Sequence, residues 1–243
     1  MSDPFFGPGI RYGFSGRADG NMSLKTGDVS SSGPDRSRFL SSLGIDRSCL
    51  VLPIQVHSAA VAVVGSAHKG RGADSAVTGI ADTDALITAE RGVCVGVQTA
   101  DCLPLLIHDP VTGAVAAVHA GWRSTAGRIA ALAVGRLASE FGSRPRDLRC
   151  LLGPSIGPCC YAVGEEFAST FPRSVERRGG RLYLDLAGEN LRQLMDSGVA
   201  ADNIGAPRAC TCCSKGFFSF RRDGASCGRM LSVIMRAYVC PDR

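Results

Sequence analysis

The feature that most constrains the fold is a series of short apolar segments in the middle of the chain. They predict strands at residues 84–88, 93–99 and 114–119, and residues 103–108 are a candidate fourth strand. The segments are apolar without alternation, a pattern typical of strands whose sheet is buried on both faces. The sequence therefore predicts a sheet covered on both sides.

The pattern on either side of these segments predicts a mixture of helices and further strands. The first forty residues, rich in Gly, Ser and Asp, indicate a loop. We expect a short helix ended by Gly44 and two strands in residues 49–64 separated near Val56–Ser58. A helix should follow that is capped by Ser124 or Thr125, has an apolar face between Ile129 and Phe141, and stops at Gly142. We also expect a strand over 148–152, a helix over 186–195 and a strand over 230–238. No boundary stands out, so we expect one α+β domain over residues 1–243, with mixed β-sheets flanked by helices.

Composition excludes several classes of protein. Apolar residues are 45% and charged residues 20% of the 243-residue chain, which excludes a mostly unfolded protein. No apolar run is long enough for a membrane span, and no signal-peptide pattern is visible at the start. The net charge of +5 comes from scattered basic residues, a distribution that favours a small anionic ligand over nucleic acid. We expect neither nucleic acid nor a membrane as partner, and no oligomeric state is assigned.

The cysteine content indicates a reducing compartment. The chain has eleven cysteines, an odd number, and we expect no export signal. Such a set is typical of cytoplasmic proteins, in which cysteines are thiols, thiolates or metal ligands. We therefore expect a cytoplasmic location.

Two of the four histidines and one cysteine stand at predicted strand ends. His57, Cys102 and His119 are a sufficient set for Zn²⁺, and three protein ligands would leave a fourth position open for water or substrate. Cys102 and His119 could instead form a nucleophile pair without metal. The structural alternative is a hydrogen-bonded core histidine and a buried thiol.

Two cysteine pairs offer a second group of sulfur ligands. Cys159–Cys160 and the CxxC within Cys210–Cys213 could together supply four thiolates to a structural zinc ion, or act as a redox dithiol. Their spacing is not that of paired CxxC motifs. The sequence therefore favours the interpretation that these cysteines are small packed residues on loops.

Several other residues are candidates for substrate binding. The loop Gly153–Tyr161 would let main chain come close to a ligand, although it could also be a structural corner. Arg123 precedes a helix start and is a candidate anion ligand. Arg221 and Arg222 lie in an aromatic segment, Phe217–Asp223, that could stack a base and pair with phosphate, or could be a strand with a solvated arginine pair.

From Gln55 to the C-terminus, the chain resembles the laccase-domain family, also called YfiH-like or multicopper polyphenol oxidase-like, in its motifs and in their order. The matching motifs are Gln55–His57, Thr99–Pro104, His119–Arg123, Gly153–Tyr161, Cys210–Thr211, Phe217–Asp223 and Gly228–Met230. The resemblance implies a YfiH-like fold with a more variable N-terminal segment, residues 1–48. It also implies a zinc site formed by His57, Cys102 and His119.

The activity that the resemblance implies is purine nucleoside chemistry. It comprises phosphorolysis of adenosine, inosine, guanosine and methylthioadenosine, and deamination of adenosine. Some members have a role in editing peptidoglycan precursors, and an older label is copper-dependent polyphenol oxidation. The chain departs from the family in having Ser58 and Ser124 where glycine is usual, and Ala162 where glutamate is usual. The missing carboxylate at 162 puts catalysis in question if that acid takes part.

These observations favour a zinc-dependent nucleoside enzyme that uses phosphate as co-substrate. Asp101, next to Cys102, is a candidate proton shuttle or a loop brace, and Arg123 with Arg221 or Arg222 would neutralise phosphate. The alternatives are a hydrolase with Cys102 as nucleophile and His119 as base, a peptidoglycan-precursor editing factor, and a non-enzymatic protein whose zinc is closed by a fourth ligand from Cys159 or Cys160. Copper oxidation is disfavoured, because four histidines cannot furnish a three-copper cluster and a separate electron-transfer site.

Overall fold

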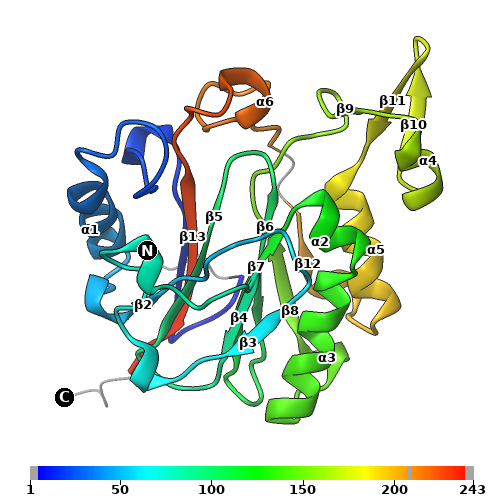
Figure 1. Ribbon diagram of the computed structural model, residues 1–243. Coiled ribbons are helices and arrows are strands. Elements are labelled where there is room, and N and C mark those ends of the chain that lie inside the picture. Colours follow the sequence, from blue (N-terminus) through cyan, green and yellow to red (C-terminus); the bar gives the residue numbers. More distant parts are fainter. Residues whose placement is uncertain (1–4, 207–208, 239–243) are drawn as a thin grey trace.

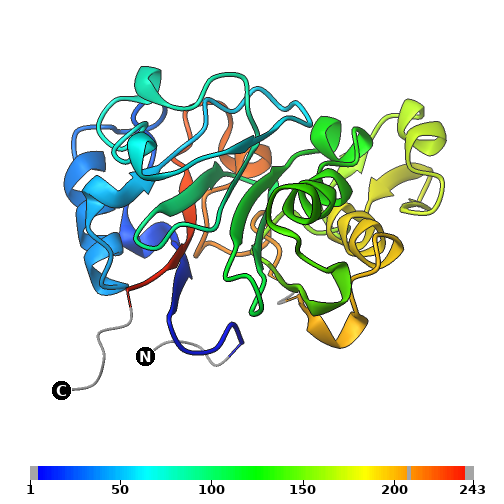
Figure 2. The same cartoon turned by 90° about the horizontal axis from the view of Figure 1, so that it is seen from below.

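A computed structural model describes residues 5–206 and 209–238. Two β-sheets pack face to face, and a helical layer covers the outer face of each (Figures 1 and 2). The strands are β1 (Ile10–Phe14), β2 (Leu50–Val51), β3 (Val61–Val63), β4 (Ala85–Thr88), β5 (Cys94–Thr99), β6 (Leu103–His108), β7 (Val115–Ala120), β8 (Arg149–Leu152), β9 (Ala162–Val163), β10 (Val175–Arg178), β11 (Arg181–Leu184), β12 (Ile204–Gly205) and β13 (Met230–Arg236). The α-helices are α1 (Ser32–Ser42), α2 (Trp122–Ala126), α3 (Ile129–Phe141), α4 (Glu166–Thr170), α5 (Leu186–Asp196) and α6 (Phe220–Asp223). Short 3₁₀ turns lie at Arg17–Asp19, Arg47–Cys49, Ser66–His68, Ala76–Thr78, Pro145–Asp147 and Ala201–Asn203.

The two large sheets have mixed strand directions. One has the order β1-β13-β5-β2, and the other the order β12-β8-β6-β7-β4-β3. A small sheet, β10-β11-β9, projects from the body beside α4 (Figure 1). The predicted single α+β domain with mixed sheets flanked by helices is confirmed.

Burial on both faces explains the unbroken apolar character of the central strands. In β6, Leu103, Leu105 and Ile107 pack toward α3 and α5, whereas Leu106 packs between the sheets. In β5, Val95 and Val97 lie between the sheets, and Cys94 faces the layer that contains α1. Strands between two covered faces bury both sets of side chains, so their sequences do not alternate.

Several local predictions were wrong or incomplete. The N-terminal segment is not only loop, because Ile10–Phe14 pairs with the C-terminal strand in register Ile10↔Arg236. Neither Ser124 nor Thr125 caps the long helix. Both lie inside the separate helix α2, and the chain turns into α3 at Arg128, whose φ is 62°. Phe220–Asp223 is a helical turn rather than a strand. None of the described helices has the length and apolar character that crossing a bilayer requires.

Candidate functional site

The structure brings the predicted ligand residues together at one end of the central strands. A cavity of about 620 Å³ opens there. Its lining includes His57, Cys102, His119, Asp101, Gln55, Gln98, Trp122, Arg123, Tyr161, Phe220, Arg221 and Arg229. His119 lies in β7, Cys102 lies in the turn between β5 and β6, and His57 lies in the segment before β3. The volume is in the range of small-molecule sites.

The donor atoms of His57, Cys102 and His119 fit a single metal ion. They lie within 4.8 Å of one another, and Sγ of Cys102 is 3.9 Å from Nε2 of His57. The imidazole rings of the two histidines are 4.9 Å apart at an interplanar angle of 77°. Among the described residues, no fourth His, Cys, Asp or Glu joins this group. Cys159 and Cys160 belong elsewhere, so the closed site expected of a non-enzymatic protein is not formed.

Asp84 holds two of these residues in place. Its carboxylate accepts hydrogen bonds from Nδ1 of His119 at 2.7 Å and from the backbone N–H groups of Val56, His57 and Ser58 at 3.2, 3.0 and 2.7 Å. Oγ of Ser58 donates a further bond of 2.9 Å. Because Nδ1 of His119 is engaged by the carboxylate, Nε2 is left for a ligand, the arrangement typical of metal-binding histidines.

Glycine at position 121 leaves room for the side chains of His57 and Cys102. A Cβ there would lie 2.9 Å from Cδ2 of His57 and 3.1 Å from Sγ of Cys102. His57 itself has a φ of 59°, and Gln55 ties its segment to β5 through two 2.8 Å hydrogen bonds with the backbone of Gln98. The motifs Gln55–His57 and His119–Arg123 thus form one geometric unit.

The site favours a charged cysteine beside a charged histidine. Burial alone would raise the pKa of the Cys102 thiol, but His119 and His57 lower it to about 6. Burial alone would lower the pKa of His119, but the neighbouring Cys102 and Asp84 raise it to about 9. The carboxyl of Asp84 is buried, yet the bonds from His119 and Ser58 hold its pKa below the usual range. A thiolate is the form of cysteine that binds metal or attacks an electrophile.

Asp101 is placed as a brace for the far wall of the cavity. Its Oδ1 accepts a 2.6 Å bond from Oγ1 of Thr211, and its Oδ2 accepts a 2.6 Å bond from the backbone N–H of Arg221. Its carbonyl accepts a bond of 2.9 Å from the N–H of Ile156. Both carboxylate oxygens have donors, which favours the bracing role over that of a proton shuttle.

The arginines have different positions. Arg123 and Arg221 line the cavity, where Arg123 lies 4.1 Å over the ring of Trp122 and Arg221 lies 5.3 Å over that of Tyr161. Arg222 is not part of the lining. Its guanidinium binds the carbonyls of residues 211, 212, 214 and 217 and the carboxylate of Asp223. Of the two arginines in this segment, only Arg221 is available to a ligand.

The departures from the family pattern have simple local consequences. The hydroxyl of Ser58 binds Asp84, whereas Oγ of Ser124 is buried without a hydrogen-bond partner in the described structure. Ala162 lies in β9, and its carbonyl accepts a 2.9 Å bond from Arg221. The position where glutamate is usual therefore touches a cavity-lining arginine through its backbone.

Sequence reasoning missed Asp84 and the N-terminal contribution to the cavity. The apolar pattern predicts Asp84 only as the first residue of a strand, although a single carboxylate at the start of a buried apolar run is a signal for a specific partner. Ser23, Lys25 and Thr26 also line the cavity. The buried Arg36 fixes this segment by binding the carbonyls of Met22, Gly72 and Ala73. No local motif marks these residues.

Comparison with known proteins gives consistent results over nearly the whole chain. The chain is 36% identical over 204 residues to adenosine deaminase RL5 from an unknown prokaryotic organism, covering 80% of this chain and 78% of that one. It is 36% identical over 227 residues to purine nucleoside phosphorylase YlmD of Geobacillus stearothermophilus, covering 89% and 83%. The crystal structure of YlmD from that organism superposes with a TM-score of 0.91 at 33% identity, covering 97% of this chain and 94% of that one.

The family model described as multi-copper polyphenol oxidoreductase laccase matches residues 11–237. That match spans both large sheets except for Ile10, and it includes every residue of the cavity described above. The chain belongs to this laccase-like, YfiH-type family.

Proposed function

We propose that the protein is a zinc-dependent enzyme that acts on purine nucleosides, by phosphorolysis and by deamination of adenosine. The observation that carries the proposal is the open group of His57, Cys102 and His119 inside a cavity of about 620 Å³. The names of the relatives, purine nucleoside phosphorylase and adenosine deaminase, supply the substrate class.

The three ligand residues would hold zinc, and Asp84 would orient His119 and the His57 segment. Zinc held in this way supplies Lewis-acid polarisation and lowers the pKa of water toward ~7. Two imidazoles and one thiolate are a usual zinc donor set. Copper oxidation is not supported, because the two remaining histidines have other roles. Nδ1 of His68 accepts from the N–H of Gly65, and the buried His108 contacts the carbonyl of Ala114.

Phosphorolysis requires a bound phosphate next to the ribose. A phosphate oxygen attacks C1′, the bond from C1′ to the purine nitrogen breaks, and the bonding electrons and a proton go to the purine. Arg123 and Arg221 are two of the cavity-lining cations, and they would neutralise phosphate. In deamination, water adds to C6 of adenosine and ammonia leaves, so this reaction needs the zinc ligands but no phosphate site.

A second candidate function has its own structural support. Cys102, His119 and Asp84 form a thiolate, an imidazolium and an orienting carboxylate, which is the arrangement of a cysteine hydrolase. In that function Cys102 would attack an amide or ester carbonyl and His119 would protonate the leaving group. Loss of activity on metal removal separates the two candidates, since the hydrolase needs no metal.

The decisive experiment is chromatographic analysis of products from adenosine, with and without phosphate. We expect adenine and ribose 1-phosphate only when phosphate is present, and inosine in both mixtures. Cys102→Ala should abolish both activities and remove zinc from this site. Full activity of that variant, or of metal-free protein that alkylation inactivates, would contradict the zinc mechanism.

A further inference from the structure

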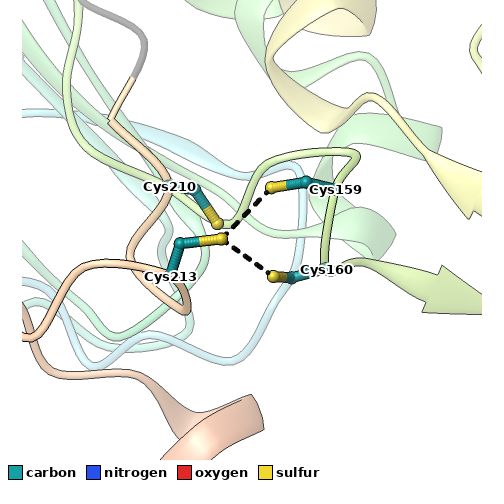
Figure 3. Close-up of side chains that lie close together, drawn as sticks. All are labelled: Cys159, Cys160, Cys210 and Cys213. Carbon is teal, nitrogen blue, oxygen red and sulfur yellow. Dashed lines mark hydrogen bonds between the residues drawn. The ribbon is translucent and has the colours of Figure 1, made fainter.

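Four cysteines form a second compact cluster outside the cavity. Sγ of Cys213 lies 3.5 Å from Sγ of Cys159 and 3.2 Å from Sγ of Cys160, and Cys210 completes the group (Figure 3). The four sulfur atoms lie within 4.8 Å of one another. Their side chains converge on one point from two loops that are about fifty residues apart in the sequence.

The spacing suits one tetrahedral ion. With Zn–S bonds of about 2.3 Å, neighbouring sulfurs in a tetrahedral site are roughly 3.8 Å apart. An iron–sulfur cluster holds its thiolates on several iron atoms, so it needs a wider arrangement. A disulfide would pair two sulfurs, whereas Cys213 approaches two others at similar distances.

The backbone around the cluster is built to hold it. Residues 155 and 210 form a β-bridge, with the N–H of Thr211 bound to the carbonyl of Ser155 at 3.0 Å. The N–H of Gly157 donates to Sγ of Cys210 at 3.2 Å, and a side chain at 157 would crowd that cysteine. Amide donors directed at sulfur stabilise a thiolate. These contacts place both loops in register before any ion binds.

Three arginines bind backbone carbonyls in or next to the two loops. Arg221 binds the carbonyl of Ala162, Arg178 binds the carbonyl of Pro158, and Arg222 binds those of Thr211 and Cys212. A divalent ion with four thiolates has a net charge of −2. The three guanidinium groups, bound to the backbone in or next to these loops, would offset part of this charge.

We propose that Cys159, Cys160, Cys210 and Cys213 bind a structural zinc ion. All four positions are filled by protein, so the ion has no open position for substrate, unlike the group in the cavity. It would tie residues 157–160 to residues 210–213. These loops adjoin cavity-lining residues, namely Ile156 and Tyr161 on one side and Phe220 and Arg221 on the other. The ion would therefore fix the wall of the cavity without taking part in the reaction.

The test is zinc stoichiometry in the untagged, full-length protein purified under reducing conditions. We expect two zinc ions per chain in the wild type and one in Cys102→Ala, in Cys160→Ser and in Cys213→Ser. Cys212→Ser is the matched control, because Cys212 is in the same loop but not in the group, and it should retain both ions. Loss of the second ion in Cys212→Ser would overturn this ligand set.

X-ray absorption at the zinc edge on the Cys102→Ala variant tests the proposed four-cysteine site even if Cys160→Ser and Cys213→Ser fail to fold. We expect four sulfur ligands at about 2.3 Å. A zinc-free Cys102→Ala chain, zinc with nitrogen or oxygen ligands, or a cluster found by mass spectrometry to be disulfide-bonded after reducing purification would overturn the proposal. A wild type with one zinc ion that Cys102→Ala retains would support this site while contradicting zinc in the cavity.

Discussion

Nδ1 of His119 donates a 2.7 Å hydrogen bond to Oδ1 of Asp84, and the two side chains are only 4% and 0% exposed. The same carboxylate binds the backbone of residues 56–58. One side chain thus connects two of the three residues that we propose as zinc ligands.

Asp84→Asn should weaken the metal site. An amide presents an NH₂ group to donors that need an acceptor, and loss of such a partner typically lowers metal affinity by about 10- to 100-fold. Zinc affinity measured by competition with a chelating dye checks this. The control is Asp82→Asn at an exposed aspartate two residues away. Unchanged affinity in Asp84→Asn would contradict the positioning role.

Gly121→Ala should disturb the cavity group while leaving the fold intact. The new methyl would press on His57 and Cys102 at 2.9 and 3.1 Å, so we expect zinc affinity and activity to fall at least about tenfold. The control is Gly135→Ala in α3, where nothing lies within 4 Å of the added atom. That control should raise the free energy of unfolding by about 0.5–1 kcal/mol. Calorimetry and zinc titration of both variants provide the comparison.

Arg221→Ala and Arg222→Ala should have different effects. We expect Arg221→Ala to raise KM for phosphate in phosphorolysis and to leave deamination less affected, because Arg221 lines the cavity. Arg222→Ala should lower the free energy of unfolding by about 2 kcal/mol, because four carbonyls lose a charged donor. Steady-state kinetics and urea unfolding measure these effects. A phosphate-specific defect in Arg222→Ala alone would reverse the assignment.

Asp101→Asn separates bracing from proton transfer. If Asp101 only braces the wall of the cavity, Asp101→Asn should lower activity while the pH profile of its kcat keeps the wild-type shape. Thr211→Val, which removes one of the two hydrogen-bond donors to the Asp101 carboxylate, should then reproduce part of that loss of activity. A kcat that loses its acid or base limb in Asp101→Asn, with Thr211→Val fully active, would instead identify Asp101 as a proton shuttle.

Acid stability should depend on Asp223. Its hydrogen bonds with Arg222 and Arg17 hold the pKa of its carboxyl well below the usual range. The folded state therefore binds fewer protons here than the unfolded state, and the stabilisation present above pH ~4 is lost as the pH falls further. Asp223→Asn should lower the free energy of unfolding at neutral pH and flatten its decline in acid, as urea titrations across this range would measure. An unchanged acid slope would contradict this.

The sequence predicted what local patterns encode. The apolar segments that became β4, β5, β6 and β7 were placed within a residue or two, because double-sided burial leaves an unbroken apolar run. The partition of α2 from α3 was missed, since it depends on the left-handed backbone at Arg128. The local sequence predicts a loop at Ile10–Phe14, because the strand there depends on pairing with a segment more than 200 residues away.

In the cavity, too, the sequence predicts some of the residues and not others. His57, Cys102 and His119 were found from their residue types at strand ends, and the structure brings them together. Asp84 was missed because its partners come from residues 56–58 and 119, and only tertiary structure unites them. Likewise, the sequence does not separate Arg221 from Arg222. The difference lies in the carbonyls that the turn at 211–217 directs at one of them.

Because Asp84 fixes both histidine segments by hydrogen bonds within the protein, the two imidazole donors would be preorganised before a metal ion binds. Metal uptake then demands little loss of chain entropy, and its rate should be governed by stripping water from the incoming ion rather than by loop folding. The site would behave as a rigid receptor that binds and releases a metal ion while the surrounding sheets keep their structure.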